Sequence, residues 1–367
     1  MRILYFSRSF IPSHEANSIH VMNMCEALTE LGHEVMLLCP RHSMMTEEMI
    51  FDYYGVKSRF KFQYVAYPHI KGRALIYVLS CLKYVLSFRP ELVVSRFLYG
   101  TFLTTLMGIP TTHDLHDKDW DNGPVSKILF SLILKSKSLK KLSFNSNGLI
   151  SLFRKKFPAL KGGPELQVLH NGSKDFPLTE TLKVPGRNEL KAGYFGNLYQ
   201  GRGIELILLI ASKLPAIDFI IVGGTEEHIK TWVDLGVSSN VYFIGFVNPK
   251  EVYKYRNSID ILLAPYAYTV SMAGNTGNSV EYMNPIKIFE YMSSKKIIIS
   301  SELKAIREVL SEENSLLIEY SNPEGWVDAL RNVSASPQVY ANRAEKAYQD
   351  FKLHYSWKAR AAKMVSQ

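Results

Sequence analysis

Short apolar segments alternate with longer amphipathic segments along the 367-residue chain, and the pattern restarts once near the middle. Such alternation is typical of parallel strands connected by helices, because the crossover between two parallel strands needs room for a helix. The chain is too long for one ordinary hydrophobic core, so we expect two domains. The predicted fold class is therefore α/β, with one doubly wound parallel sheet in each half.

The expected strands fall into two groups, which we interpret as two Rossmann-like domains. In the first half they are residues 2–7, 34–40, 61–67, 91–97, 109–116, 141–146 and 166–171. In the second half they are residues 191–197, 218–224, 241–246, 260–266 and 296–301. Ligands of open α/β sheets bind beyond the carboxyl ends of the strands, so the loops that follow these strands are the candidate functional segments.

The predicted domain boundaries follow from one polar stretch, SKDFPLTETLKVPGRNEL, which contains proline and glycine. We expect an N-terminal domain over residues 1–175, a linker over 176–190 and a C-terminal domain over 191–345. The dinucleotide fingerprint GxGxxG follows the first strand of neither half, which argues against a dehydrogenase, the main rival that this fold class suggests.

The segment NPIKIFEYM, residues 284–292, has a sharply specified helix start. Asn284 is a good N-cap, and Pro285 suits the first helical position. The free amides of Ile286 and Lys287 then sit at the positive end of the helix dipole, and Lys287 adds a full charge, so this end is a candidate phosphate site.

Glu290 lies one turn beyond that site and has two possible roles. A carboxylate here can accept hydrogen bonds from the hydroxyls of a ribose, as acidic residues do in other nucleotide folds. Alternatively, Lys287 and Glu290 form a surface ion pair that contributes a few tenths of a kcal/mol, roughly, to stability. The local sequence favours neither interpretation.

A second candidate anion site is GNLYQGRG, residues 196–203, which follows the first strand of the second half. The glycines at 196, 201 and 203 let the backbone approach a ligand closely, and Arg202 supplies a fork suited to phosphate. Glycine-rich turns are also common as simple loops, so this motif alone is weak evidence for an anion site. Its position at a strand end in the same domain as NPIKIFE strengthens that interpretation.

In the first half, HDLHD places His113, Asp114, His116 and Asp117 at the end of a strand. Strand alternation sends these side chains to different sides, so a closed metal site is not expected. A histidine at a strand end can instead position a hydroxyl or share a proton, although a purely structural histidine is the default interpretation of the pattern alone.

The composition, with 47% hydrophobic and 21% charged residues, is that of a folded, water-soluble protein. Three cysteines without paired spacing argue against a disulfide framework and favour a reducing cytoplasm. The chain opens directly with a strand pattern, so we expect no signal peptide. No apolar run reaches the roughly 18 residues that span a bilayer.

The formal net charge of +9 predicts an anionic partner, with basic residues dense in the amphipathic segments between residues 127 and 156. Zinc-finger spacing and RNP-type aromatic motifs are missing from the sequence, so nucleic acid is not the expected partner. An anionic membrane surface or lipid carrier ranks higher. A solvated basic face explains the same charge.

Taken together, these segments resemble the glycosyltransferases of family 4, the large retaining group with the GT-B fold. In the first half the resemblance is carried by SRSFIPSHEANSIHVMNMCEALTELGHEV, GIPTTHDLHD, FNSNGLISLF and VLHNGSKDF. In the second half it is carried by YFGNLYQGRGIELI, FIIVGG, VYFIGFVNPKEVYKY, DILLAPY, NPIKIFEYM and YSW. It implies two Rossmann-like domains facing across a cleft, with a C-terminal helix, residues 346–367, that returns to the N-terminal domain.

The resemblance also implies roles for single residues. Arg202 matches the basic position that contacts the donor diphosphate, and the amides of Ile286 and Lys287 match those that cradle a phosphate. Glu290 matches the second glutamate of the family's pair, which holds the donor ribose, and His116 matches the histidine beside the transferred sugar. The catalytic residues it implies are His116, Arg202 and Lys287; further donor-binding residues are Gly196, Asn197, Gly223 and Pro285, and acceptor-side residues are Ala16, Asn17 and Ser18.

The sequence departs from the family pattern at three places. Tyr282 stands where the first glutamate of the pair would fall, and Glu281 precedes it, as in a branch of the family with the signature PxKxxEYM. Asn197 stands where many members have an arginine. Residues 16–18 read Ala-Asn-Ser where many members have a double glycine.

The expectation from these observations is a metal-independent, retaining hexosyltransferase without a cofactor, peripheral on the cytoplasmic face of the cell membrane. Its donor would be a nucleotide diphosphate sugar, with UDP as first choice and GDP as second. Its acceptor would be a hydroxyl of a lipid-linked or cell-surface polysaccharide. The alternatives are a nucleotide-sugar epimerase or phosphorylase of the same fold, or a noncatalytic module that binds a membrane or polysaccharide.

Overall fold

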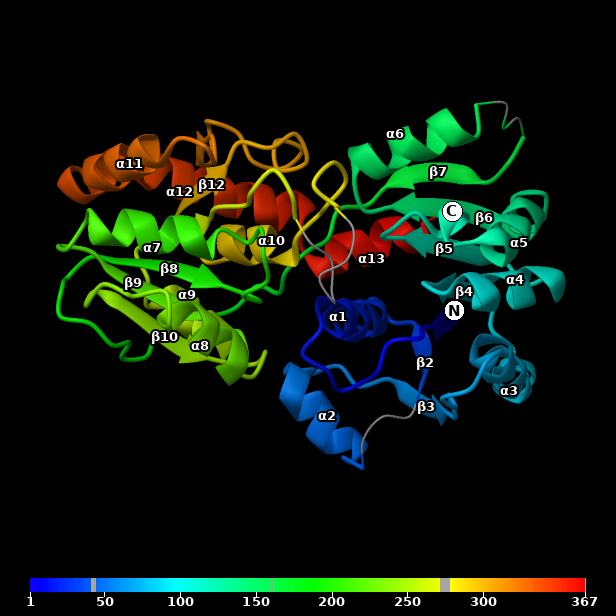
Figure 1. The fold of residues 1–367 in the computed structure, drawn as a ribbon. Helices are drawn as coiled ribbons and strands as arrows, with labels where there is room; N and C mark the ends of the chain where they lie inside the picture. The colour runs from blue at the N-terminus through cyan, green and yellow to red at the C-terminus, as the bar shows by residue number, and fades with distance from the viewer. Residues whose placement is uncertain (41–43, 159, 161, 271–277, 367) are drawn as a thin grey trace. The chain divides into compact units, whose positions relative to one another are not determined.

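The computed structural model describes residues 1–40, 44–158, 160, 162–270 and 278–366. The chain divides into two compact units, Met1–Asn171 with Trp357–Gln367, and Gly172–Ser356. Each unit is built around one parallel sheet connected by helices (Figure 1). The predicted α/β class with two parallel sheets is confirmed.

The first unit contains a seven-stranded sheet with the order β3-β2-β1-β4-β5-β6-β7. Its strands are β1 (Arg2–Phe6), β2 (Glu34–Pro40), β3 (Lys61–Val65), β4 (Leu92–Ser95), β5 (Thr111–Leu115), β6 (Leu139–Phe144) and β7 (Glu165–Val168). Its helices are α1 (Ala16–Glu30), α2 (Glu47–Tyr54), α3 (Arg73–Phe88), α4 (Leu98–Leu106), η1 (Asp119–Asp121), α5 (Pro124–Leu134), α6 (Asn147–Lys156) and α13 (Trp357–Val365). The strand order reverses between β1 and β4, which is the point where open sheets of this type bind ligands.

The second unit contains a six-stranded sheet with the order β10-β9-β8-β11-β12-β13. Its strands are β8 (Lys191–Phe195), β9 (Asp218–Val222), β10 (Val241–Gly245), β11 (Ile261–Ala264), β12 (Ile297–Ser301) and β13 (Leu316–Ile318). Its helices are α7 (Ile204–Ser212), α8 (Glu226–Val233), α9 (Val252–Asn257), α10 (Ile286–Ser293), α11 (Pro323–Ala335) and α12 (Pro337–His354). The sequence predicted every strand except β13, which is too short to show a clear pattern.

Successive residues along the strands of the second sheet point to opposite faces, and each face packs into its own hydrophobic cluster. Phe195 and Leu262 pack on one face with Phe289 of α10 and Phe351 of α12. Tyr194, Leu263 and residues of α7 and α11 form the cluster on the other face. Helix α10 is therefore anchored directly against the sheet.

Tyr291 fixes α10 at the carboxyl ends of two central strands. Its buried hydroxyl accepts a hydrogen bond of 2.9 Å from the amide of Phe195 at the end of β8, and donates one of 3.1 Å to the carbonyl of Leu263 in β11. Both bonds satisfy backbone groups at the strand ends. The start of α10 thus lies close to the loops that follow these strands.

The unit boundaries differ from the prediction at both ends of the second unit. The expected linker, residues 176–190, belongs to the second unit, because Asn257 donates hydrogen bonds of 2.9 Å to the carbonyls of Pro177 and Glu180 and Phe176 stacks on Tyr253. Helix α12 also stays with the second unit, and the chain joins the first unit from Trp357 rather than from residue 346. Polarity and proline content suggested a free linker, but they do not report such tertiary contacts.

Two further features bear on the sequence predictions. All three cysteines, Cys25, Cys39 and Cys81, are buried free thiols. Among the helices of the described ranges, none combines the length and apolar character that a membrane crossing requires.

Candidate functional site

In the second unit, the glycine-rich loop after β8 is pressed against neighbouring backbone. The amide of Gly196 donates to the carbonyl of Val222 at 2.9 Å, and a Cβ on Gly223, whose φ is +118°, would lie 2.2 Å from the Gly196 carbonyl oxygen. A Cβ on Gly203 would lie 1.7 Å from the carbonyl oxygen of Pro265. Only glycine fits at these positions, so the loop is held tightly at the strand ends.

Lys287 reaches from the first turn of α10 toward this loop. Its Nζ lies 3.7 Å from the ring centroid of Tyr194 and 5.2 Å from that of Tyr266, and a Cβ on Gly196 would be 3.0 Å from it. The Nζ is buried and has no hydrogen-bond partner among the described residues. Within the described residues, the charged amine is attracted to these two aromatic faces.

Arg202 places a second positive charge beside Lys287. The guanidinium carbon of Arg202 lies 5.7 Å from the centroid of Tyr266, the ring that Lys287 also approaches. Burial, and then the charge of Arg202, lowers the pKa of the Lys287 amine well below its ordinary value, although Glu290 opposes the shift. This part of the site therefore attracts an anion, and a diphosphate would bring negative charge to both side chains.

The structure corrects the predicted start of α10. The helix begins at Ile286, and Pro285 occupies the N-cap position with extended dihedrals of −72° and 127° rather than the first helical position. No side-chain hydrogen bond caps this end, so the predicted N-cap role of Asn284 is wrong. A proline ring fixes φ near −65°, which suits either position, so the sequence alone could not settle the offset of one residue.

Glu290 has a partner that neither sequence interpretation named. Its carboxylate lies 3.4 Å from a terminal nitrogen of Arg256 in α9, and the Arg256 side chain is 2% exposed. The Arg256 Nε–H also donates to the Ser294 hydroxyl at 3.3 Å. The ion pair expected as an alternative, between Glu290 and Lys287, is thus replaced by one with Arg256, and Glu290, with 27% of its side chain exposed, can still reach a ligand.

Three other predicted residues of this unit take distinct positions. Asn197 is exposed and its carbonyl accepts a hydrogen bond of 2.7 Å from the Tyr194 hydroxyl. Tyr282, at the position of the missing glutamate, is buried, whereas Glu281 is exposed. The neighbouring residues 271–277 lie outside the described ranges.

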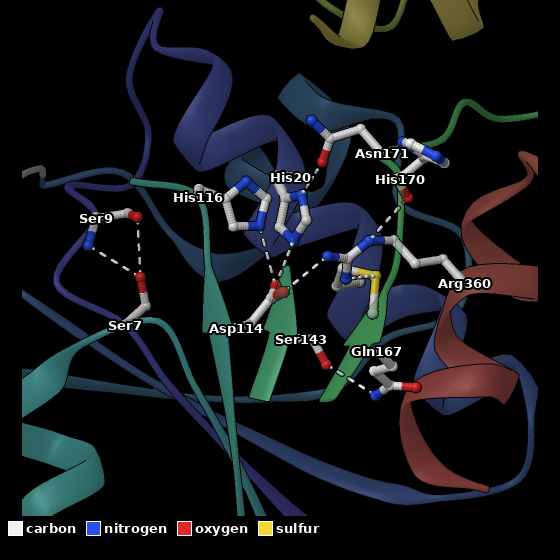
Figure 2. A network of polar contacts seen from close by, with 11 residues as sticks. Ser7, Ser9, His20, Asp114, His116, Ser143, Gln167, His170, Asn171 and Arg360 are labelled. Atoms are coloured by element: carbon white, nitrogen blue, oxygen red, sulfur yellow. Dashed lines mark hydrogen bonds and ion pairs between the residues drawn. The ribbon is translucent and has the colours of Figure 1, made fainter. Parts of the chain in front are cut away.

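In the first unit, Asp114 at the end of β5 is the centre of a buried polar cluster (Figure 2). One carboxylate oxygen accepts a hydrogen bond of 2.8 Å from Arg360 of α13. The other lies 3.1 Å from Nε2 of His116 and 3.3 Å from Nε2 of His20 in α1. The expectation that Asp114 and His116 point to different sides is wrong, because residues two apart along a strand project to the same face.

The cluster controls the protonation of both histidines. Burial, followed by the charge of Arg96, lowers the pKa of His116 to about 4 and that of His20 well below its ordinary value. Burial alone would raise the pKa of Asp114, but Arg360 and the histidines hold it well below its usual range. Neutral His116 that donates from Nε2 to Asp114 leaves Nδ1 as an acceptor, which can bind a hydroxyl proton.

His20, Asp114 and His116 are also the one group of potential metal ligands found in the described part of the chain, with ligand atoms within 4.8 Å of one another. The charge distribution disfavours a cation there. Arg360 already neutralises Asp114, and the charge of Arg96 acts on both histidines. The geometry fits three ligands, but the electrostatics favour neutral histidines and a neutral or anionic ligand.

The predicted acceptor-side residues lie at the start of α1. Ala16 is exposed, and Asn17 has a buried side-chain oxygen without a hydrogen-bond partner in the described residues. Ser18 is buried, donates to the carbonyls of Ser13 and Glu15, and accepts a hydrogen bond of 2.9 Å from the Tyr54 hydroxyl. Its hydroxyl holds the helix start in place, so only Asn17 offers a polar group to a ligand.

Sequence reasoning missed the residues that surround the predicted ones. His20, Arg256 and Arg360 are buried polar residues within amphipathic helices, and Tyr194 lies in an apolar strand. A charged residue at the apolar position of a helix was the available signal for Arg256 and Arg360, because isolated charges are rarely buried without a function or a partner.

Two family models match most of the chain. Residues 18–172 match the model described as Glycosyltransferase Family 4, and residues 189–336 match the model described as Glycosyl transferases group 1. The first match covers most of the first unit and ends at its boundary, the second lies within the second unit, and each contains part of the clusters described above. Both models describe glycosyltransferases, so the resemblance seen in the sequence is supported for each of the two matched regions.

Curated relatives match the chain over a limited region. A phosphatidyl-myo-inositol mannosyltransferase from Mycolicibacterium smegmatis is 22% identical over 52% of this chain and 47% of its own length. TuaH from Bacillus subtilis, which is named for teichuronic acid biosynthesis, is 23% identical over 54% of this chain and 46% of its own length. The matched region thus spans about half of each relative.

Solved structures match over nearly the whole chain. A sucrose-phosphate synthase from Thermosynechococcus elongatus has a TM-score of 0.72 at 14% identity, covering 99% of this chain and 97% of its own. HepE from Anabaena, in complex with UDP-glucose, has a TM-score of 0.67 at 13% identity, covering 100% and 98%. This likeness establishes the GT-B fold.

The neutral state of His116 predicts an acid-sensitive first unit. The pKa of His116 is about 4 in the folded chain, whereas a histidine of the unfolded chain titrates near about 6.5. The unfolded state therefore binds more protons between these values, so stability is complete above about pH 6.5 and falls by up to about 1.4 kcal/mol per pH unit below it. In the variant His116→Gln, the free energy of unfolding should therefore fall less between pH 7 and pH 5 than in the wild type. Urea unfolding at pH 7, 6 and 5 measures this difference.

The matched control is His69→Gln, since His69 is exposed in the same unit. That variant should lose stability with acid as the wild type does. Identical acid dependence in His116→Gln and the wild type would contradict a buried neutral His116.

Proposed function

We propose that the chain is a retaining glycosyltransferase that moves a hexose from a nucleotide diphosphate sugar to an acceptor hydroxyl. The proposed donor is a UDP-sugar, with a GDP-sugar as second choice. The second unit binds the donor and the first unit binds the acceptor. The proposed acceptor is a lipid-linked or cell-surface polysaccharide.

The buried amine of Lys287 is the observation that carries the proposal. A buried ammonium group without a partner costs folding free energy and lowers its own pKa. Arg202 increases this cost, and Glu290 is engaged by Arg256. The two phosphates of a nucleotide diphosphate would compensate Lys287 and Arg202 together, with the amides of Ile286 and Lys287 as further donors.

The same cations suit the departure of a diphosphate. Negative charge develops on the leaving oxygen as the glycosidic bond breaks, and fixed cations in a poorly solvated site stabilise it. No covalent nucleophile is assigned, and retention is proposed to follow from attack on the face from which the diphosphate leaves. His116, oriented by Asp114, accepts or positions the acceptor proton through Nδ1.

Glu290 is proposed to bind the ribose hydroxyls. Arg256 holds one side of its carboxylate, which fixes the orientation of the group and leaves acceptor positions for the two hydroxyls. The choice of UDP rests on HepE, a structure of the same fold in complex with UDP-glucose. The choice of acceptor rests on relatives named for an inositol lipid and for teichuronic acid.

We further propose that no metal takes part in transfer. Lys287, Arg202 and the helix amides supply the positive charge that a metal would otherwise bring to the diphosphate. In the first unit, Arg360 and Arg96 oppose a cation at the histidine cluster. Turnover that is unchanged by EDTA would support this point, and turnover abolished by EDTA and restored by Mg²⁺ would contradict it.

Peripheral attachment to the cytoplasmic face of the membrane is part of the proposal. Helix α5 exposes Val125, Ile128 and Leu132 at spacings of three and four residues, which places them on one face. The following segments carry Lys135, Lys137, Lys140 and the basic end of α6. An exposed apolar stripe beside basic residues fits the surface of an anionic bilayer.

Donor binding tests the assignment of the second unit. Lys287→Met should weaken binding of UDP by about 30-fold or more, because it removes a buried charge partner worth about 2 kcal/mol or more. Arg202→Ala should weaken UDP to a similar extent, and Glu290→Ala should weaken UDP and its sugars by about tenfold. Calorimetry with UDP, GDP and their sugars measures each effect.

Lys230→Met, an exposed change in α8, is the matched control and should bind UDP as the wild type does. Unchanged affinity and turnover in all three site variants would contradict the assignment. Product formed without an acceptor would identify an epimerase, and product dependent on free phosphate a phosphorylase. Absence of nucleotide binding would favour a noncatalytic module.

Vesicle binding tests the proposed attachment. The full chain should bind phosphatidylglycerol vesicles at low salt, and Ile128→Ser with Leu132→Ser should weaken binding by about tenfold, since each removes buried apolar area at the interface. Leu235→Ser, at a residue 71% exposed in the second unit, is the control. No binding by the wild type, or equal binding by the double variant, would contradict the proposal.

A further inference from the structure

Arg96 lies at the switch point of the first sheet, directly after β4. Its amide donates to the carbonyl of Phe6 at 3.0 Å, which continues the pairing of β4 with β1. The register pairs Ser95 with His113 on the other side, so Arg96 stands level with Asp114 of β5. Paired residues of parallel strands project to the same face, so Arg96 belongs to the face that carries the Asp114 cluster.

Within the described residues, the carboxylates that attract Arg96 are also engaged by other side chains. The two carboxylates whose charge reaches it are Asp114 and Asp119. Asp114 is bonded to Arg360 at 2.8 Å, and Asp119 lies 3.2 Å from His113. The Nη1 of Arg96 is buried and has no hydrogen-bond partner among the described residues.

Other polar atoms on the same face also lack partners. The hydroxyl of Tyr5 in β1 and the side-chain oxygen of Asn145 after β6 are buried and unpaired within the described ranges. Tyr5 pairs with Val94, which lies two residues before Arg96, so Tyr5 and Arg96 share a face of the sheet. Ser143 pairs with Asp114 and lies two residues before Asn145, so Asn145 lies on that face as well. Buried polar groups are normally satisfied, so unsatisfied groups on the face that carries the buried Nη1 of Arg96 indicate a ligand site.

We infer that Arg96, with Tyr5 and Asn145, forms a subsite for an anionic oxygen group of the acceptor, either a carboxylate or a phosphate. The guanidinium fork would bind two oxygens of that group, and the Tyr5 hydroxyl would donate to it. His116 would then face a hydroxyl of the same molecule. The inference rests on the proposed function only in identifying the ligand as the acceptor.

Histidine signals in NMR spectra test the subsite without any nucleotide. Full-length protein labelled at histidine ring carbons is titrated at constant ionic strength with glucuronate, inorganic phosphate or glucose, and His20→Gln and His116→Gln assign the nearby signals. Glucuronate or phosphate should shift these signals saturably, and glucose should not. The anion that binds identifies the source of the charge.

Arg96→Gln and Arg96→Met should weaken this response by about 30-fold or more, because a charge-assisted pair is lost. Two variants are used so that the test can still be made if one of them fails to fold. Arg59→Gln changes an exposed arginine of the same unit and should respond as the wild type does. The proposal is overturned if glucose shifts the signals equally, if neither anion shifts them, or if the Arg96 variants respond like the wild type. Since UDP is not added, failure here leaves the donor assignment intact.

Discussion

Buried cationic nitrogens without a hydrogen-bond partner in the described residues are the constraint around which both functional clusters are organised. In the second unit, Lys287 is buried against Tyr194 without a hydrogen-bond partner in the described residues, and Arg202 adds to the charge. In the first unit, the Nη1 of Arg96 is also buried without a hydrogen-bond partner in the described residues. The nearby carboxylates compensate this charge only in part, because Arg256 engages Glu290 and Arg360 engages Asp114. Burying such charge lowers the stability of the free protein, and an anionic ligand would offset this loss when it binds. The buried nitrogens therefore point to anionic ligands in both units.

The parallel sheets explain why these groups gather where they do. All strands of a parallel sheet end at one edge, so the loops after β8, β9 and β11 reach the start of α10. Tyr291 fixes that helix to two strand ends, and Gly223 brings the loop backbone into direct contact with Gly196. In the first unit, the carboxyl end of β5 meets α1 and α13, which brings His20 and Arg360 to Asp114 from distant parts of the sequence.

The sequence predicted the architecture well, because apolar periodicity and loop chemistry are local properties. It identified both strand sets, the position of α10 and the loop with Arg202, while β13 was too short to recognise. It failed where a role depends on contacts between distant segments. The pairing of Glu290 with Arg256, the convergence of Asp114 and His116, and the docking of residues 176–190 on α9 arise from tertiary structure. Local rules carry no information about such partners, although a lone arginine on an apolar helix face was a usable sign.

The pKa of Lys287 reports directly whether its amine is buried without a counter-charge. Protein labelled at the lysine Cε carbons can be titrated by NMR with and without UDP, using Lys287→Met to assign the signal. We predict a pKa well below the ordinary lysine value in the free protein. The pKa should rise when the diphosphate supplies negative charge, so UDP binding should be accompanied by uptake of protons. An ordinary pKa in the free protein, or a depressed one that UDP leaves unchanged, would contradict this prediction.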